Sequence, residues 1–173
     1  MMENPKPKIV FWGTSDFSVP ALESLVKAGY SISAVVTVPD EPKGRKLILT
    51  PPPIKIMAEK YKIPVFQPSD LKSYNLQPTT YNLFIVAAYG KIIPQNILDL
   101  PKLGALNIHP SLLPRWRGPS PIQAAILNGD KETGVTIIKI DEKMDHGPIL
   151  ATSDGLQVTS NINYEHLHDQ LAN

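Results

Sequence analysis

The chain has 173 residues, of which 42% are hydrophobic and 19% are charged, and its formal net charge is +1. These values are typical of a globular domain that is large enough to bury a core. The absence of cysteine excludes disulfides, zinc-thiolate centres, iron-sulfur clusters and a cysteine nucleophile. The small net charge indicates that any contact with nucleic acid is local.

The sequence contains no sign of a membrane segment. No apolar run reaches the length of a membrane-spanning helix, and residues 1–5 lack the apolar segment of a signal peptide. We therefore expect a cytoplasmic protein that does not bind a membrane. We separately expect it to be a monomer. The 18 prolines lie between apolar runs and do not form a low-complexity tract.

The first half of the chain alternates short apolar runs with helical patterns. Residues 8–12 predict a buried strand, and apolar positions at helical spacing predict a helix from Ser18 to Gly29. Only Gly13 follows the first strand, so the G-x-G-x-x-G fingerprint is missing and we expect no nicotinamide cofactor. Further strands are predicted at 32–38, 65–66 and 81–88, and further helices at 54–61 and 94–98.

A charged, proline-containing segment at residues 39–46 predicts a long loop. It carries three cations, Lys43, Arg45 and Lys46. These side chains allow two interpretations, either a solvated surface or a clamp for phosphates.

The second half repeats the pattern of strands and helices. Residues 103–108 predict a buried strand, and a capping box from Ser120 to Gln123 predicts the start of a helix. Apolar runs at 134–140 and 148–152 predict an antiparallel hairpin around a polar loop, and an amphipathic helix is predicted from Tyr164. We expect an α/β fold with a doubly wound, mostly parallel sheet, in one domain spanning residues 1–173.

A polar pair, Asn107 and His109, ends the strand predicted at 103–108. The two residues are two apart in an extended segment, so their side chains project to the same side. Asn107 offers an amide donor, His109 can exchange protons near neutrality, and Asp145 on a separate loop could orient the imidazole. Such a set suits proton transfer and oxyanion binding, at the sheet edge where open α/β folds place ligands.

Other interpretations of these residues stay open. Ser111 could act as a nucleophile with His109 and Asp145, although it lacks the G-x-S-x-G context of a nucleophile elbow. A metal site formed by His109, Asp145 and His146 is less well supported because their spacing is irregular. Asn107 could simply cap a turn, and His109 could be a structural histidine.

The remaining histidines and the cations after the central strand have simpler predicted roles. We expect His146, His166 and His168 to be surface or structural residues. Arg115 and Arg117 are expected to pair with carboxylates or an anionic ligand, and Trp116 to pack. These expectations depend only on residue type and local pattern.

The run Asn-Ile-His-Pro-Ser-Leu-Leu-Pro-Arg-Trp-Arg-Gly at residues 107–118 closely resembles the folate-dependent formyltransferases. Asn107, His109 and Asp145 match the catalytic trio of that family residue by residue. Residues 11–17, 119–123 and 144–150 extend the likeness to the members that act on methionyl-tRNA. The resemblance covers nearly the whole chain and implies a Rossmann-like formyltransferase fold.

The resemblance also implies a reaction. A formyl group would pass from 10-formyltetrahydrofolate to the α-amine of methionine on initiator tRNA, with no metal. Asn107 and His109 would stabilise the oxyanion of a tetrahedral intermediate, and Asp145 would hold His109 and help to move the proton. The segment matching the family's folate site is Ser111, Leu112, Leu113 and Pro114, and Lys43, Arg45 and Lys46 match the basic insertion that enters the acceptor stem.

Two alternatives remain at this stage. The acceptor could be an amino sugar nucleotide or glycinamide ribonucleotide, for which the basic loop has no evident use. The chain could also be a non-catalytic fragment that binds folate or RNA. Family members that act on tRNA carry a further OB-like C-terminal domain, and this chain ends at Asn173 inside a predicted helix, so we expect a truncated catalytic domain without it.

Overall fold

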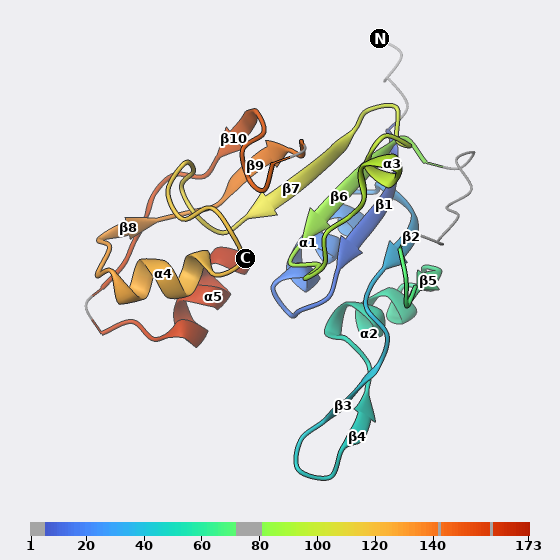
Figure 1. Cartoon of the computed structure of the whole chain (residues 1–173), viewed down its shortest axis with the longest axis horizontal. Coiled ribbons are helices and arrows are strands. Elements are labelled where there is room, and N and C mark those ends of the chain that lie inside the picture. Colours follow the sequence, from blue (N-terminus) through green and yellow to red (C-terminus); the bar gives the residue numbers. More distant parts are fainter. Residues whose placement is uncertain (1–5, 72–80, 142, 160) are drawn as a thin grey trace. The chain divides into compact units, whose positions relative to one another are not determined.

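The structure is a computed structural model that describes residues 6–71, 81–141, 143–159 and 161–173 (Figure 1). The chain forms two compact units, Met1–Ala105 and Leu106–Asn173. The N-terminal residues 1–5, in which no signal peptide is expected, and Glu142 of the predicted polar loop lie outside the described residues.

The first unit is built on a parallel sheet. Its strands are β1 (Lys8–Gly13), β2 (Ser31–Val36), β5 (Val65–Phe66) and β6 (Leu83–Ala87), in the order β6-β1-β2-β5. Neighbours pair in parallel, with Phe11 opposite Val35 on one side and Ile85 on the other. Continuous apolar runs form these strands because both faces of a parallel sheet are buried.

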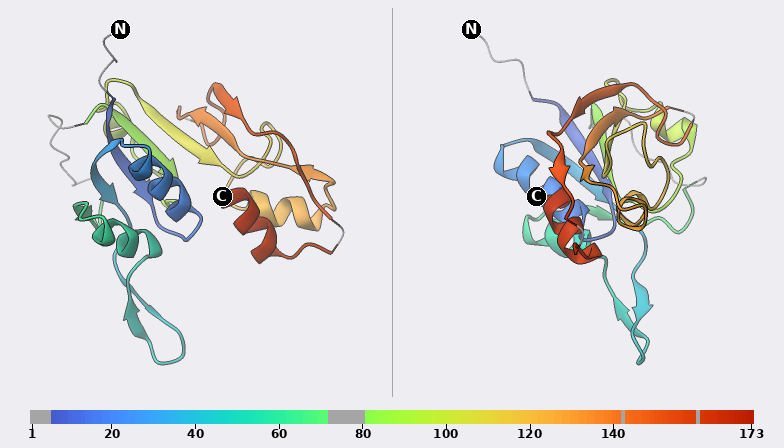
Figure 2. Two further views of the ribbon diagram at one scale, coloured as in Figure 1. Left: turned by 180° about the vertical axis from the view of Figure 1, so that it is seen from behind. Right: turned by 90° about the vertical axis from the view of Figure 1, so that its left-hand side faces the viewer.

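Three helices belong to this unit: α1 (Ser18–Lys27), α2 (Pro53–Lys60) and α3 (Gln95–Leu98). Figure 2 shows α1 and α2 on one face of the parallel sheet, and both helices contact β2. Helix α1 starts very close to the end of β1, since a Cβ at Gly13 would lie 2.8 Å from the Cβ of Ser18. The single glycine of this turn therefore serves the packing of strand against helix.

The segment expected as a long loop is a β-hairpin instead. Strand β3 (Glu41–Lys43) pairs antiparallel with β4 (Ile48–Thr50), and Figure 1 shows the hairpin projecting from the unit. Gly44 and Leu47 take left-handed φ values of 70° and 49°, which closes the turn between the strands. The prediction stopped at the charges and missed the β-forming run that follows them.

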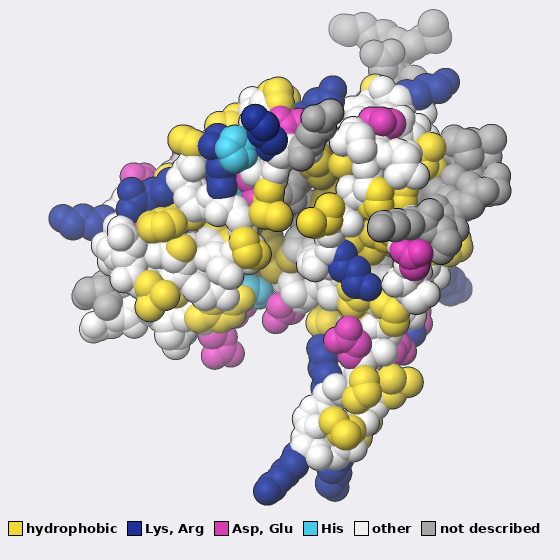
Figure 3. All heavy atoms as spheres, viewed as in Figure 1, with side chains coloured by type: hydrophobic (Ala, Val, Ile, Leu, Met, Phe, Trp, Pro, Cys, Tyr) yellow, Lys and Arg dark blue, Asp and Glu magenta, His cyan; other side chains and the backbone are white. Residues whose placement is uncertain are grey.

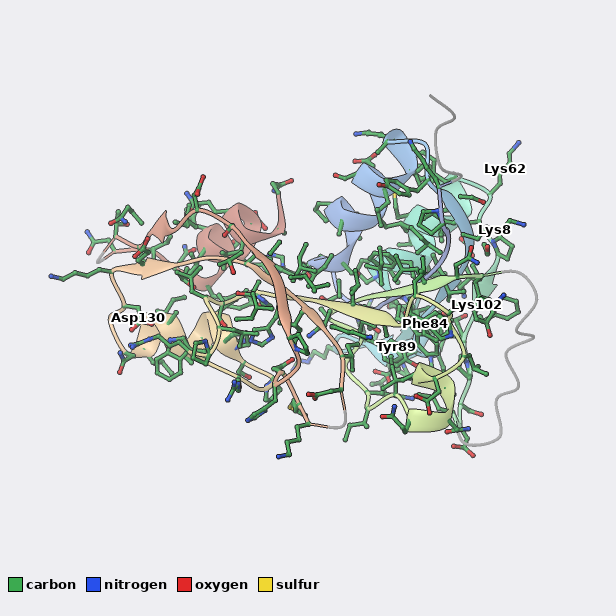
Figure 4. The ribbon with its side chains drawn as sticks, turned by 90° about the horizontal axis from the view of Figure 1, so that it is seen from above. Lys8, Lys62, Phe84, Tyr89, Lys102 and Asp130 are labelled. Carbon is green, nitrogen blue, oxygen red and sulfur yellow. The ribbon has the colours of Figure 1, made fainter. Side chains whose placement is uncertain are left out.

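Strand β6 is shorter than the run predicted at 81–88. Ala88 has a φ of 45°, which ends the strand, and Tyr89 then turns into the core. Its ring meets Trp12 edge-on at 5.2 Å, and its burial raises the pKa of Tyr89 to about 12. Figure 4 labels Tyr89 beside Phe84 of β6. Because it is buried and its pKa is raised, Tyr89 is a neutral packing residue.

The second unit contains an antiparallel set of strands. Strand β7 (Ala105–His109), which starts at the last residue of the first unit, pairs with β9 (Thr136–Lys139), and β9 pairs with β10 (Ile149–Thr152). The hairpin predicted from residues 134–140 and 148–152 is confirmed. A separate short pair joins β8 (Glu132–Thr133) and β11 (Leu156–Gln157).

Two helices complete the second unit, α4 (Pro121–Leu127) and α5 (Tyr164–Ala172). Ser120 is the N-cap of α4, but its side chain makes no capping hydrogen bond, so the predicted capping box is wrong. Its ψ of 51° is far from the extended conformation in which a serine hydroxyl reaches the helix amides. Helix α5 does have a side-chain cap, since Asn163 Oδ1 accepts from the His166 backbone at 2.9 Å.

The expected fold class is confirmed. Every pairing in the main sheet of the first unit is parallel, and antiparallel pairing is found in the second unit and in the β3–β4 hairpin. Within the ranges described, no helix is both long enough and apolar enough to cross a membrane.

Candidate active site

The second unit brings Asn107 and Asp145 into contact. Asn107 is paired with Ile138 in the sheet, and its side chain reaches the loop after β9, where Asp145 lies. Asn107 Nδ2 donates a hydrogen bond to Asp145 Oδ1 at 3.1 Å. Asp145 holds a φ of 54°, an uncommon conformation for a residue other than glycine and one that often marks functional sites.

His109 faces the other oxygen of the same carboxylate. The distance from His109 Nδ1 to Asp145 Oδ2 is 3.6 Å, and the two side chains are only 5% and 10% exposed. The backbone N–H of Gly118 donates to Asp145 Oδ2 at 2.9 Å. The structure therefore brings together the three residues predicted as a catalytic set, with both carboxylate oxygens held in place.

The second ring nitrogen of His109 is also engaged. Nε2 lies 2.9 Å from the backbone oxygen of Trp116. A carbonyl oxygen can only accept a hydrogen bond, so Nε2 carries a proton in this arrangement. Nδ1 is then the nitrogen that faces Asp145, and the tautomer of the neutral ring is fixed.

Ser111 has a structural role and is not placed as a nucleophile. It is fully buried, and its hydroxyl donates to the backbone oxygen of Arg115 at 2.6 Å. This bond contradicts the alternative of a Ser111 triad with His109. Thr136 completes the arrangement, since its hydroxyl donates to the Ser111 carbonyl at 2.6 Å and accepts from the Leu113 N–H at 3.1 Å.

These bonds hold residues 111–114, the segment predicted to line the folate site. Leu112 and Leu113 are partly exposed and Pro114 is exposed, so apolar surface is available on a backbone that is fixed at several points. The Leu113–Pro114 peptide is cis.

Asp130 is a functional candidate that the sequence prediction missed. Its carboxylate accepts from Arg115 Nε at 2.9 Å, and also from Arg115 Nη2, Trp116 Nε1 and the side-chain amide of Asn128. The Arg115 guanidinium, assisted by Trp116 and Asn128, lowers the pKa of Asp130 from 3.8 to about 2. The expected pairing of Arg115 with a carboxylate is confirmed.

The other two residues of this run behave differently from Arg115. Trp116 packs as expected, with its ring 4.9 Å from the Arg115 guanidinium, and its indole N–H reaches Asp130. Arg117 donates to the backbone oxygen of Asp145 at 2.9 Å. It therefore supports the loop that carries Asp145, through the main chain.

The histidines outside the trio do not join it. His146 Nδ1 lies 2.7 Å from the Met144 carbonyl, His166 is exposed, and His168 is buried beside Asp169. In the part of the chain that the structure describes, no group of three or more metal-binding side chains converges. His109, Asp145 and His146 are thus not arranged as the alternative metal site required.

The first unit presents the basic hairpin. Lys43, Arg45 and Lys46 are all exposed, and Figure 3 shows Lys and Arg side chains at the tip of the projecting hairpin with hydrophobic side chains along it. The apolar residues are Leu47, Ile48 and Leu49, at 72%, 62% and 63% exposure. Cationic and apolar groups are therefore presented together to solvent.

A cavity of about 230 Å³ lies at the base of this hairpin. It opens beyond the carboxyl ends of β1 and β2, where parallel α/β sheets bind ligands. Its lining includes Thr14, Ser15, Asp16, Pro39, Lys43 and Pro52.

Comparison with known protein families identifies the class to which this chain belongs. The chain matches the sequence profile described as Formyl transferase over residues 7–173, and it belongs to that family. The predicted resemblance is confirmed at this level.

Individual relatives are similar over nearly the whole chain. The methionyl-tRNA formyltransferase of Geobacillus sp. (strain WCH70) is 48% identical over 169 residues, and that of Halalkalibacterium halodurans is 46% identical over 172 residues. Each alignment covers 95% of this chain and 53% of the relative, so the chain spans about half the length of these proteins.

Solved structures agree with the fold. The phosphoribosylglycinamide formyltransferase of Anaplasma phagocytophilum superposes with a TM-score of 0.77 at 24% identity, covering 97% of this chain and 80% of that one. The enzyme of the same name from Bacillus halodurans gives a TM-score of 0.73 at 24% identity, covering 95% and 87%. At this level of identity the likeness establishes a shared fold.

Proposed function

We propose that this chain carries the catalytic site of a methionyl-tRNA formyltransferase. It would transfer the formyl group of 10-formyltetrahydrofolate to the α-amine of methionine esterified to initiator tRNA. The convergence of Asn107 and His109 on one carboxylate carries this proposal, since Asn107 is hydrogen-bonded to Asp145 and His109 Nδ1 lies 3.6 Å from it. The identity to proteins named for this activity supports it.

The reaction needs one attack and one departure at the formyl carbon. The methionine amine attacks the carbon and forms a C–N bond, and the carbonyl oxygen becomes an oxyanion. Collapse of this tetrahedral intermediate breaks the bond to N10 of the folate, which leaves with a proton. No covalent bond to the protein is required.

The three side chains fit these steps. Asn107 has two amide hydrogens, and only one is used by Asp145, so the second can donate to the oxyanion. His109 and Asp145 form an adjoining pair that can take the proton lost by the attacking amine and return it to N10. Asp145 also fixes the Asn107 amide, and its carboxylate can pair with the His109 ring once that ring has taken up a proton on Nδ1.

Of the segment matched to the folate site, Leu112, Leu113 and Pro114 would line the donor site, and the buried Ser111 would hold their backbone. The hydrogen bonds of Ser111 and Thr136 fix the backbone of this segment. A fixed, partly apolar surface suits the flat ring system of a folate at low entropic cost. No metal is needed by this chemistry.

Lys43, Arg45 and Lys46 would hold the tRNA acceptor. Exposed cations on a projecting hairpin can approach phosphates, and the apolar side chains between them can contact bases. An acceptor as small as glycinamide ribonucleotide or an amino sugar nucleotide leaves this surface without a role. We further propose that the protein acts in the cytoplasm and as a monomer.

A formylation assay tests the proposal. The protein would be incubated with 10-formyltetrahydrofolate and methionyl-tRNA, with His109→Ala as the negative control. We expect formylmethionyl-tRNA from the native protein and none from the variant. Formylation of glycinamide ribonucleotide or a sugar amine in preference to methionyl-tRNA would overturn the assignment of the acceptor, and no formyl transfer to any of them would overturn the enzyme.

A further inference from the structure

The backbone at Trp116 is held in an uncommon conformation next to the catalytic set. Trp116 has a φ of 58°, and its carbonyl oxygen accepts from His109 Nε2 at 2.9 Å. The left-handed conformation is unfavourable for an L-residue with a Cβ. Such a conformation persists only where the surrounding structure holds it.

Asp130, in the turn after α4, stabilises this conformation of Trp116. The helix end is fixed by backbone bonds, since Gly129 N donates to Ile126 O and Asp130 N donates to Ala125 O, both at 3.0 Å. Figure 4 labels Asp130 in this turn. Its side chain is only 5% exposed, whereas that of its partner Arg115 is 54% exposed.

The bonds of Asp130 hold the two residues that lead into the peptide whose carbonyl reaches His109. The carboxylate accepts two bonds from Arg115 and one from the indole of Trp116. Because both side chains are tied to one anchor, neither can turn without breaking charge-assisted bonds, and the carbonyl of Trp116 stays directed at the imidazole.

We propose that Asp130 is a positioning residue for formyl transfer, which fixes the Trp116 carbonyl on His109 Nε2 and thereby sets the tautomer and orientation of the catalytic imidazole. This inference rests on the proposed function of His109. Loss of the anchor frees the carbonyl, and the ring can then carry its proton on Nδ1 or rotate away from Asp145. The expected signature is a loss of rate without a loss of donor binding.

Two variants test this role. Asp130→Asn keeps the size of the side chain but removes its charge and places an amide against Arg115. Trp116→Phe keeps an aromatic ring and removes only the indole donor. We expect kcat to fall at least 10-fold in Asp130→Asn and less in Trp116→Phe, with KM for 10-formyltetrahydrofolate changed less than 2-fold, because small displacements of a catalytic group cost about this much or more.

A spectroscopic measurement reads the imidazole directly. The chain has four histidines, and His109→Gln assigns the His109 signals in two-bond ¹H–¹⁵N spectra. We expect the Nε2–H tautomer in the native protein and a mixture in Asp130→Asn. Glu23→Gln is the matched control, since Glu23 also accepts from several partners but lies on α1 in the first unit, and it should match the native protein.

The outcomes separate this inference from the proposed function. If the native protein transfers no formyl group, the proposed function fails, and the tautomer measurement still tests the role of Asp130. An unchanged tautomer in Asp130→Asn, or an unchanged kcat, would overturn the positioning role. Unfolding of both variants at the assay temperature, seen by circular dichroism, would overturn it in favour of a purely structural one.

Discussion

Asn107 Nδ2 and Asp145 Oδ1 are joined by a hydrogen bond of 3.1 Å, although the residues are 38 positions apart in the chain. The bond ties the end of a strand to a loop that follows a different strand. It uses one amide hydrogen of Asn107 and leaves the other for a ligand. A donor already oriented before the reaction needs no reorganisation when charge develops on the substrate, and this is the condition for strong oxyanion stabilisation.

Replacing Asn107 by Asp should remove the hydrogen-bond donor to the oxyanion while keeping the size of the side chain. The new carboxylate would face that of Asp145 and would offer no hydrogen to an oxyanion. We expect the single-turnover rate of formyl transfer to fall about 100-fold or more, the range seen for lost oxyanion donors. Asn82→Asp is the matched control, because Asn82 uses its oxygen to accept from the Lys8 N–H and keeps that ability as aspartate. A near-native rate in Asn107→Asp would refute the donor role.

Asp145→Asn should separate charge from backbone conformation. Asparagine tolerates the left-handed φ of 54° found here, so the loop should keep its shape. The partner of His109 then loses its negative charge, and we expect the rate to fall by about 10² to 10⁴, as for other acid–base groups. Thermal unfolding checks that the fold is retained. If the rate falls only together with the unfolding temperature, the charge has no catalytic role.

Neutralising the basic hairpin should weaken tRNA binding through its salt dependence. Changing Lys43, Arg45 and Lys46 to Gln removes three exposed cations, and the slope of log K against log salt should fall by about 0.7 to 0.9 for each lost phosphate contact. The control removes three other exposed cations of the same unit, Lys8, Lys62 and Lys102, which Figure 4 labels. Filter binding with methionyl-tRNA at several salt concentrations measures the slope for each triple variant. Equal slopes in the two triple variants would make the hairpin an ordinary solvated surface.

Most of the fold could be predicted from local patterns in the sequence. The apolar runs predicted the parallel strands, because a strand that is buried on both faces is apolar along its whole length. The polar pair at the end of β7 identified Asn107 and His109 for the same reason, since polar residues interrupt an otherwise apolar run.

Features that depend on distant partners were missed. Asp130 meets Arg115 and Trp116 across 15 and 14 residues, and only the folded chain brings them together. The β3–β4 hairpin was hidden because prolines and charges dominate its first strand, while pairing with Ile48 to Thr50 overrides that local preference. The capping box at Ser120 failed because side-chain capping depends on backbone angles that residue type does not determine.

Gly147 should be essential to the loop that presents Asp145. A Cβ at this position would lie 1.7 Å from the backbone oxygen of Lys139, so an alanine must displace the backbone. We expect Gly147→Ala to lower the free energy of unfolding by about 2 kcal/mol or more, as overpacking does, and to reduce the rate of transfer. Gly129→Ala is the control, because its Cβ would meet nothing within 4 Å and its φ of 63° costs only about 1 kcal/mol. Urea denaturation compares them, and equal losses would contradict the steric argument.

The hydrogen bonds that Asp130 accepts should make the free energy of unfolding depend on pH in the acid range. The pKa of Asp130 is about 2 in the folded protein, below its ordinary value of 3.8, because Arg115 and the other donors favour the carboxylate. A lowered folded pKa means that the unfolded chain takes up the proton first. The contribution of the Asp130 charge to the free energy of unfolding is therefore complete above about pH 5 and is lost as the pH falls from about 4 towards 2.

Comparison with Asp130→Asn isolates this contribution. At pH 7 we expect the free energy of unfolding of the variant to be about 1.5 to 3 kcal/mol lower than that of the native protein. This is the cost of losing hydrogen bonds to a charged group. The gap should narrow below pH 4, because Asp130 of the unfolded native chain takes up a proton there while the folded carboxylate stays ionised, and the amide of the variant does not titrate. Urea denaturation at pH 7, 5, 4 and 3 measures it. A difference that stays constant down to pH 3 would show that the variant loses stability through packing, and that the charge of Asp130 stabilises nothing.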